Sequence, residues 1–99
     1  MICVQVTCKD RAEAEKIALI LLEKKLIACA NIFPADSMYL WKGKIERGAE
    51  FVMFGKTLRE KFAAIKKEVV HVHSYDVPFV GAWEEMTTNE IEEWMKKEL

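Results

Sequence analysis

Residues 2–26 read ICVQVTCKDRAEAEKIALILLEKKL, and the period of their hydrophobic pattern changes after the first third. Ile2 to Thr7 mixes β-branched residues with alternating polarity, which predicts a half-buried strand. Asp10 then precedes Glu13 by three residues, as in the capping box at the start of a helix. Apolar residues follow at helical spacing, namely Ala14, Ile17, Ala18 and Leu21. The stretch therefore predicts a strand and then an amphipathic helix that ends near Leu26.

The next stretch predicts a long, bent hairpin. β-forming residues return from Ala28 to Ile45, with an interruption at Pro34, and a second such run covers Glu50 to Lys56. Between the two runs, Arg47-Gly48 has the composition of a turn. We therefore expect two antiparallel strands that reverse direction at residues 47–48.

The C-terminal half predicts two more helices separated by a short strand. Thr57 and Glu60 form a second capping box. Behind it, apolar residues recur every three or four positions at Leu58, Phe62, Ile65, Val69 and Val72. Pro78 starts a short β run through Trp83, and Thr87 with Glu90 then caps a last amphipathic helix. That helix carries Ile91, Trp94 and Met95.

The predicted order is β-α-β-β-α-β followed by an added C-terminal helix. This order is typical of the ferredoxin-like α+β sandwich, in which both long helices pack on one face of an antiparallel sheet. No Pro-rich or Ser-rich linker and no repeat divides the chain, so residues 1–99 are expected to form a single domain. The fold hosts enzymes, metal carriers and small-molecule sensors, so function has to come from particular residues.

The composition and charge of the chain exclude several classes of binding partner. The chain is 52% apolar, and 15 Lys and Arg stand against 16 Asp and Glu, for a net charge of -1. Scattered charge of this kind argues against a nucleic-acid surface and against a polybasic membrane anchor. The longest purely apolar run, Ile17 to Leu22, is far shorter than the roughly 20 residues of a membrane span. The opening MICVQVTCKD lacks the pattern of a secretory leader, so we expect a cytoplasmic protein.

Catalytic motifs are missing. The sequence contains no G-x-S-x-G, no Walker loop and no G-x-G-x-x-G, so we expect no hydrolase, kinase or dinucleotide chemistry and no enzyme activity. Cys29 lies in the apolar context Leu26 to Ala30, which favours a buried structural thiol over a nucleophile. Cys3 and Cys8 are five apart on one strand and should face opposite sides, so all three thiols are expected to be unpaired.

The two histidines form an H-x-H pair with two interpretations. On a strand, His71 and His73 would share one face and could hold a metal ion together, with Asp76 adding an oxygen ligand suited to copper or zinc. At a helix C-terminus, the same spacing would make the rings diverge, and the helix dipole would favour an imidazolium. The sequence leaves both interpretations open.

Four segments resemble the CutA family, the divalent-cation tolerance proteins. They are Ala28–Ile32 (ACANI), Ser37–Ile45 (SMYLWKGKI), Lys56–Thr57, and His73–Pro78 (HSYDVP). The resemblance extends from the first strand to Trp94, and the order and spacing of the segments make it specific.

The resemblance implies a ferredoxin-like subunit in a tight homotrimer, similar in architecture to the PII signalling proteins. It also implies a role in tolerance of copper and other divalent cations. The pattern of residues favours association as well, because the hairpin is long for a small sheet and its edges would leave backbone N–H and C=O groups unpaired.

The resemblance also suggests site residues. We rank His73 first, Asp76 second and Cys29 third as ligands of Cu(II) or another divalent cation, and we expect no obligatory cofactor. Tyr39, Trp41, Lys56 and Tyr75 match family positions that line a cleft between subunits. The chain departs from the family pattern at three positions where some relatives carry polar ligand candidates, which here are Val6, Val72 and Phe79.

Two alternatives to metal binding stay open. One is a PII-like sensor that binds a small metabolite or nucleotide, using Lys56 for anionic charge and the aromatic residues for stacking. The short turn between Lys42 and Glu50 speaks against the long signalling loop that such a sensor would carry. The other is a non-catalytic trimeric scaffold whose apparent site is only an interface.

Overall fold

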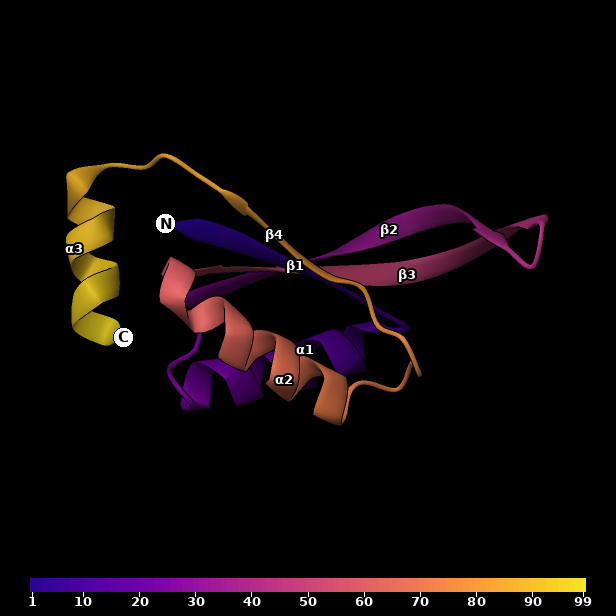
Figure 1. The fold of residues 1–99 in the computed structure, drawn as a ribbon, viewed down its shortest axis with the longest axis horizontal. Helices are drawn as coiled ribbons and strands as arrows, with labels where there is room; N and C mark the ends of the chain where they lie inside the picture. The colour runs from indigo at the N-terminus through magenta and orange to yellow at the C-terminus, as the bar shows by residue number, and fades with distance from the viewer.

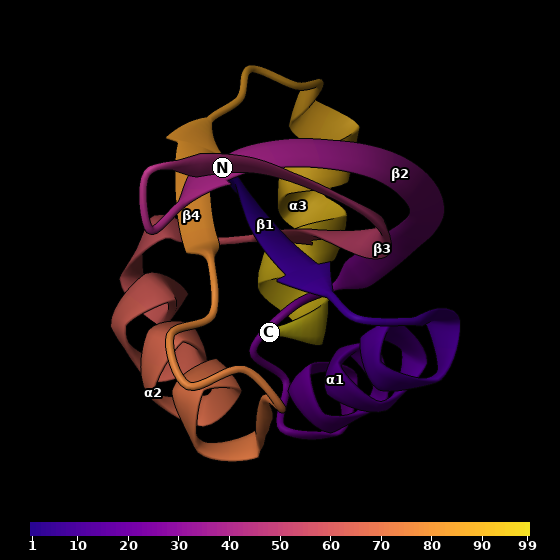
Figure 2. The same cartoon turned by 90° about the vertical axis from the view of Figure 1, so that its right-hand side faces the viewer.

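The computed structural model describes all 99 residues, which form an α+β fold (Figure 1). Its elements are β1 (Ile2–Cys8), α1 (Arg11–Glu23), β2 (Cys29–Trp41), β3 (Lys44–Thr57), the 3-10 turn η1 (Arg59–Lys61), α2 (Phe62–Val72), β4 (Val80–Glu84) and α3 (Asn89–Glu98). The four antiparallel strands lie in the order β2-β3-β1-β4. Helices α1 and α2 cover one face of this sheet, and α3 lies at one end (Figures 1 and 2). The predicted ferredoxin-like fold with an added C-terminal helix is confirmed.

Alternation along β1 divides the sheet into two faces. Ile2, Val4, Val6 and Cys8 point toward the helices and belong to the buried core. Cys3, Gln5 and Thr7 alternate with them and point to the opposite face. That second face carries an edge-to-face aromatic row, in which the centroids of Phe33 and Phe54 are 4.9 Å apart and those of Phe54 and Trp83 are 5.2 Å apart.

Helix α1 begins where the sequence predicts and ends earlier. The Glu13 N–H donates to Asp10 Oδ1 at 2.8 Å, which confirms the predicted cap. The predicted end near Leu26 is wrong, because Lys25 adopts a left-handed φ of 56° and the Leu26 N–H turns back to Leu21 O at 2.8 Å. Glycine usually occupies that left-handed position, so a lysine there does not indicate from the sequence that the helix ends.

The hairpin turns earlier than the sequence predicts. Lys42 and Gly43 have φ of 50° and 77°, so both central residues of a two-residue turn are left-handed and the flanking Trp41 and Lys44 pair directly. The predicted turn at Arg47-Gly48 is wrong, since both residues lie inside β3. The correct turn lengthens the two strands to 13 and 14 residues, and they project from the domain as an arm (Figure 1).

This turn makes a testable prediction. Replacing Gly43 by alanine is expected to lower the free energy of unfolding by about 1 kcal/mol, because a Cβ disfavours a left-handed backbone. The matched control is Gly48→Ala, where φ is not left-handed and no atom lies within 4 Å of the added Cβ. Urea unfolding of both variants at one protein concentration compares them. Equal destabilisation would contradict the proposed importance of the turn.

Two predicted caps are wrong. Thr57 does not cap a helix, since it is the buried last residue of β3 and its Oγ1 donates to Leu26 O at 2.6 Å. Helix α2 starts after η1 without a side-chain cap. At the last helix, the Ile91 N–H donates to Thr88 Oγ1 at 3.3 Å, so Thr88 rather than Thr87 is the cap. Strand β4 begins two residues later than predicted.

No helix has both the length and the apolar character that crossing a membrane requires.

Candidate functional site

His73 ends helix α2 with a fully buried side chain that is hydrogen-bonded at both nitrogens. Its Nε2 lies 2.8 Å from Thr7 O, and its Nδ1 accepts from the Tyr75 N–H at 3.0 Å. Because Nδ1 accepts, the ring proton of the neutral imidazole is on Nε2 and donates to Thr7 O. His71 is exposed on the last turn of α2. The two rings therefore diverge, as the helix-terminus interpretation predicts.

Glu13 on helix α1 also contacts the loop that contains His73. Its buried carboxylate accepts from the Lys9 N–H at 3.1 Å through Oε1 and from the Ser74 N–H at 2.9 Å through Oε2. Burial opposes the charge of the carboxylate, but the hydrogen bonds from the Ser74 and Lys9 N–H groups outweigh it and lower the pKa of Glu13. One carboxylate thus connects the start of α1 to the loop after α2.

Cys8 completes a group that we call the buried triad, made of Cys8, Glu13 and His73. The ligand atoms of the three side chains lie within 4.8 Å of one another, and no other three His, Cys, Asp or Glu side chains come together in this way. Burial raises the pKa of the Cys8 thiol to about 12, so the thiol is protonated at neutral pH. One nitrogen, one oxygen and one sulfur form a donor set that suits zinc or copper better than calcium.

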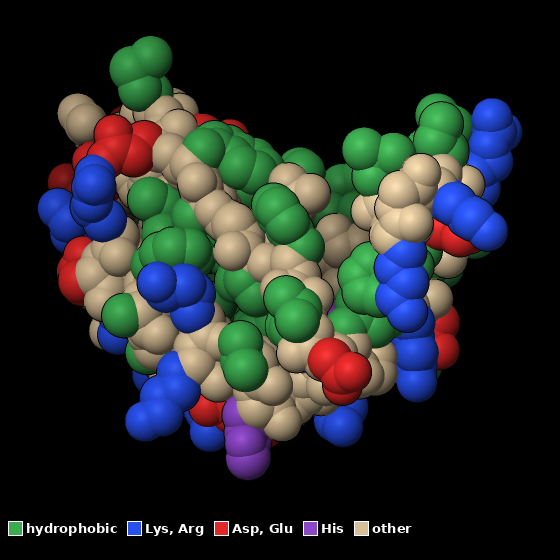
Figure 3. Space-filling model, turned by 45° about the vertical axis from the view of Figure 1, so that its right-hand side comes forward, with side chains coloured by type: hydrophobic (Ala, Val, Ile, Leu, Met, Phe, Trp, Pro, Cys, Tyr) green, Lys and Arg blue, Asp and Glu red, His purple; other side chains and the backbone are tan.

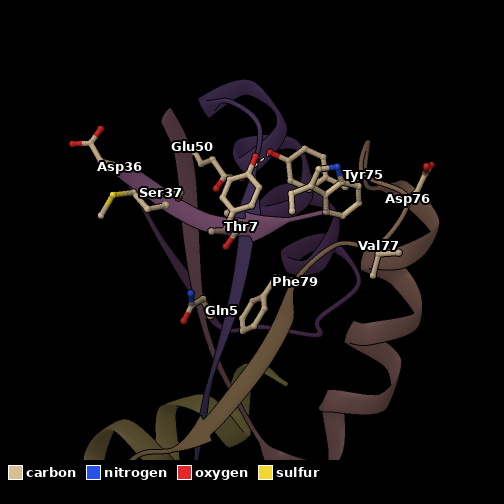
Figure 4. A pocket seen from close by; sticks show the side chains of 12 residues that line it. Gln5, Thr7, Asp36, Ser37, Glu50, Tyr75, Asp76, Val77 and Phe79 are labelled. Atoms are coloured by element: carbon tan, nitrogen blue, oxygen red, sulfur yellow. Dashed lines mark hydrogen bonds between the residues drawn. The ribbon is translucent and has the colours of Figure 1, made fainter. Parts of the chain in front are cut away.

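A second feature is an open pocket of about 780 Å³ on the sheet face opposite the helices, which we call the hairpin pocket. It is lined by Gln5, Thr7, Asp36, Ser37, Met38, Tyr39, Trp41, Glu50, Tyr75, Asp76, Val77 and Phe79. Its side chains come from β1, from the hairpin arm and from the segment before β4 (Figure 4). The Tyr75 hydroxyl donates to Glu50 Oε2 at 2.7 Å and links the arm to that segment. Figure 3 shows the surface hollowed between the arm and the body of the domain.

The structure distributes the sequence-predicted metal ligands over three places. His73 lies in the buried triad, whereas Asp76 is exposed on the wall of the hairpin pocket. Cys29 is half-buried at the start of β2, opposite Lys56. The chain therefore does not assemble His73, Asp76 and Cys29 into one site. Cys8 and Glu13 take their place beside His73.

The predicted cleft residues divide in a similar way. Tyr39, Trp41 and Tyr75 meet in the hairpin pocket, as grouped from the sequence. Lys56 does not line it. Instead, Lys56 Nζ lies 2.8 Å from Glu85 Oε2, and this pair raises the pKa of Lys56.

The thiols of Cys3, Cys8 and Cys29 are all free, which confirms that prediction. Cys3 and Cys29 pair in register with Lys56 from its two sides. Two strand spacings put their Cα atoms about 9–10 Å apart, beyond the reach of a disulfide.

Comparison with known proteins decides the family. The sequence profile described as "CutA1 divalent ion tolerance protein" matches residues 2–98. The chain belongs to the CutA1 family. The resemblance seen in the sequence is thereby confirmed, and with it a general connection to tolerance of divalent cations.

Individual relatives agree in sequence and in fold. The divalent-cation tolerance protein CutA of Archaeoglobus fulgidus is 51% identical over 79 residues, covering 80% of this chain and 78% of the relative. The protein of the same description from Thermococcus kodakarensis is 37% identical over 99 residues, covering 99% and 95%. The solved CutA structure from Archaeoglobus fulgidus, described as periplasmic, has a TM-score of 0.95 at 44% identity and covers 99% of this chain and 98% of its own. The cytoplasmic location expected for this CutA1 chain stays a prediction.

Proposed function

We propose that this CutA1-family protein is a non-catalytic homotrimer of the cytoplasm that binds a divalent metal ion, with copper as the first choice, in the service of cation tolerance. The observation that carries the metal proposal is the buried triad, where three side chains from β1, α1 and the end of α2 bring nitrogen, oxygen and sulfur ligands within 4.8 Å. Relatives described as divalent-cation tolerance proteins support the same function.

The hydrogen bonds of the triad favour reversible loading. Both nitrogens of His73 and both oxygens of Glu13 have partners without an ion, so the fold does not need a metal to satisfy them. To offer Nε2 as a ligand, His73 has to give up its bond to Thr7 O and move its ring proton to Nδ1. There the proton would face the Tyr75 N–H. Loading is therefore expected to rearrange residues 73–76 and to be weak or transient.

The ligand set makes a prediction for metal titration. His73→Gln and Cys8→Ser are each expected to weaken Cu(II) and Zn(II) binding at least tenfold, because each removes one ligand of the triad. Cys29→Ser and Asp76→Asn are the matched controls and should leave the affinity unchanged. Calorimetric titration of the anaerobically purified protein measures this, after circular dichroism has shown that each variant is folded. Loss in the Asp76 or Cys29 variant with no loss in the Cys8 variant would favour the sequence-ranked ligands over the triad.

The trimer is supported by the geometry of the hairpin arm. Strand β3 pairs with β1 only over residues 51–57, so residues 35–50 form a two-stranded ribbon outside the four-stranded sheet. An isolated ribbon of this kind is marginally stable in water. Its exposed apolar side chains include Met38, Leu40, Trp41 and Ile45. Burial against neighbouring copies of the chain would stabilise the arm and cover the edge of β2.

The hairpin pocket favours a small-molecule sensor as the second candidate function, but with a ligand other than the nucleotide considered from the sequence. A nucleotide needs positive charge, yet the pocket is lined by three carboxylates and by no lysine or arginine. Lys56, which the nucleotide alternative would use, is paired with Glu85 elsewhere. The pocket of this chain thus argues against an anionic ligand and leaves open a small molecule of another charge.

A further inference from the structure

We propose that metal loading of the buried triad releases the base of the hairpin arm, with Tyr75 as the connection between the two. This inference rests on the metal site of the proposed function and names what that site controls. A chain of three hydrogen bonds carries it, running from Thr7 through His73 and Tyr75 to Glu50. All three are made within one copy of the chain, so the connection does not depend on whether neighbouring copies cover the arm.

The buried triad lies beside the base of the arm. Cys8 of the triad pairs in register with Phe51, where β3 leaves its pairing with β1. Glu50 directly precedes Phe51 and belongs to the two-stranded ribbon, in which it pairs with Ala35. The arm therefore leaves the sheet next to the strand end that supplies one ligand of the triad.

Tyr75 holds the base of the arm to the loop that follows α2. Its hydroxyl donates to Glu50 Oε2 at 2.7 Å, and we call this bond the arm tether (Figure 4). Burial and the bond to the Glu50 carboxylate raise the pKa of Tyr75, so its hydroxyl stays a neutral donor. Hydrogen bonds to a charged acceptor are stronger than those between neutral groups. The tether is therefore a bond whose loss the arm should register.

The backbone of Tyr75 responds to the protonation of the His73 ring. Without metal, the Tyr75 N–H donates to His73 Nδ1 at 3.0 Å, and the two ring centroids are 4.8 Å apart. When His73 offers Nε2 as a ligand, its ring proton lies on Nδ1. Two N–H donors then face each other, and neither has an acceptor. The Tyr75 backbone consequently has to move away from the ring.

Displacement of Tyr75 competes with the arm tether. O–H···O hydrogen bonds keep their strength only between about 2.5 and 3.0 Å, so a bond of 2.7 Å tolerates little movement of its donor. Loading of the triad and an intact tether therefore oppose each other. Such coupling is reciprocal: if loading breaks the tether, loss of the tether has to favour loading by the same factor.

Zinc titration of tether variants tests this reciprocity. Tyr75→Phe removes only the hydroxyl and is expected to bind Zn(II) about fivefold more tightly or better, at the lower end of typical coupling between sites. Glu50→Ala should give the same gain, and the double variant should gain no more than either single one. Tyr39→Phe is the matched control, since its hydroxyl lies in the same pocket without bonding to Glu50, and its affinity should stay unchanged. Unchanged or weaker binding by folded Tyr75→Phe would overturn the proposal.

Hydrogen exchange of the wild-type protein follows the arm directly. Zn(II) should speed exchange of the amides of residues 44–50 at least threefold and leave residues 51–57 of the same strand unchanged. Cys8→Ser, which lacks one ligand of the triad, should lose this response. An arm whose exchange does not respond to bound zinc would refute the release. Absence of zinc binding by wild type would refute both the metal site and this inference, whereas binding through Cys8 and His73 with no gain in Tyr75→Phe would refute this inference alone.

Discussion

Replacing Glu13 by alanine is expected to lower the free energy of unfolding by about 4 kcal/mol. The variant would remove the two hydrogen bonds that the carboxylate accepts from the Lys9 and Ser74 N–H groups, and each hydrogen bond to a charged group contributes about 1.5–3 kcal/mol. Loss of the negative charge at the N-terminus of α1 adds a smaller amount. Urea unfolding measures the change. The matched control is Glu15→Ala on the exposed side of the same helix, which should change the free energy by about 0.5 kcal/mol or less.

The more conservative Glu13→Gln gives the same prediction a pH dependence. The pKa of Glu13 is lowered in the folded protein, so the charged carboxylate stabilises the fold above its unfolded pKa, which is about 4.3. This stabilisation disappears as the pH falls through the folded pKa. The stability difference between wild type and Glu13→Gln should therefore be largest near neutral pH and should shrink below pH of about 4. A difference that is independent of pH would show that shape, and not charge, makes Glu13 important.

Hydrophobic periodicity is enough to predict the fold from the sequence, whereas the positions of the turns are harder to predict. The strand at residues 2–7 and the helix stripe of Ala14, Ile17 and Leu21 were visible because burial leaves a regular pattern. The turn at Lys42-Gly43 is not evident from the sequence, because Arg47-Gly48 has an equally turn-like composition. Only the pairing of Trp41 with Lys44 decides between them. Thr57 was misassigned for a similar reason, since its hydroxyl bonds to Leu26, a residue that is distant in sequence.

The candidate site was predictable only in part. His73 and the aromatic residues of the hairpin pocket were identified from the family pattern. The sequence indicates only the helix cap for Glu13, because its second role depends on the Ser74 N–H, which follows α2 and is distant in sequence. Cys8 alternates toward the helices on β1, a direction visible in the sequence, but its distance from His73 depends on how the helices pack. Contacts between distant segments leave no local pattern, so the triad needed the structure.

The largest expected effect concerns assembly. Leu40 and Ile45 face each other across the hairpin and are 76% and 73% exposed, so the single chain does not need them for its core. In the proposed trimer they would be covered by neighbouring copies. Burial of each such side chain contributes about 1.5–3 kcal/mol, so the six Leu40 and Ile45 side chains of one trimer contribute about 9–18 kcal/mol. The pair of substitutions Leu40→Lys and Ile45→Glu should remove this contribution, while their opposite charges keep the strands of one chain compatible.

Wild type is therefore expected to run at three times the 11.5 kDa of the chain in size exclusion with light scattering at low micromolar protein, and the double variant as the monomer. Because dissociation and unfolding are linked, the thermal midpoint of wild type should rise with protein concentration and that of the variant should not. Val70→Lys is the control, since Val70 is 59% exposed on α2 in the helical layer, and it should stay trimeric. A wild-type monomer of 11.5 kDa with a concentration-independent midpoint would refute the trimer. In that case the hairpin arm would have to be stable as a ribbon without partners, against the usual marginal stability of such structures.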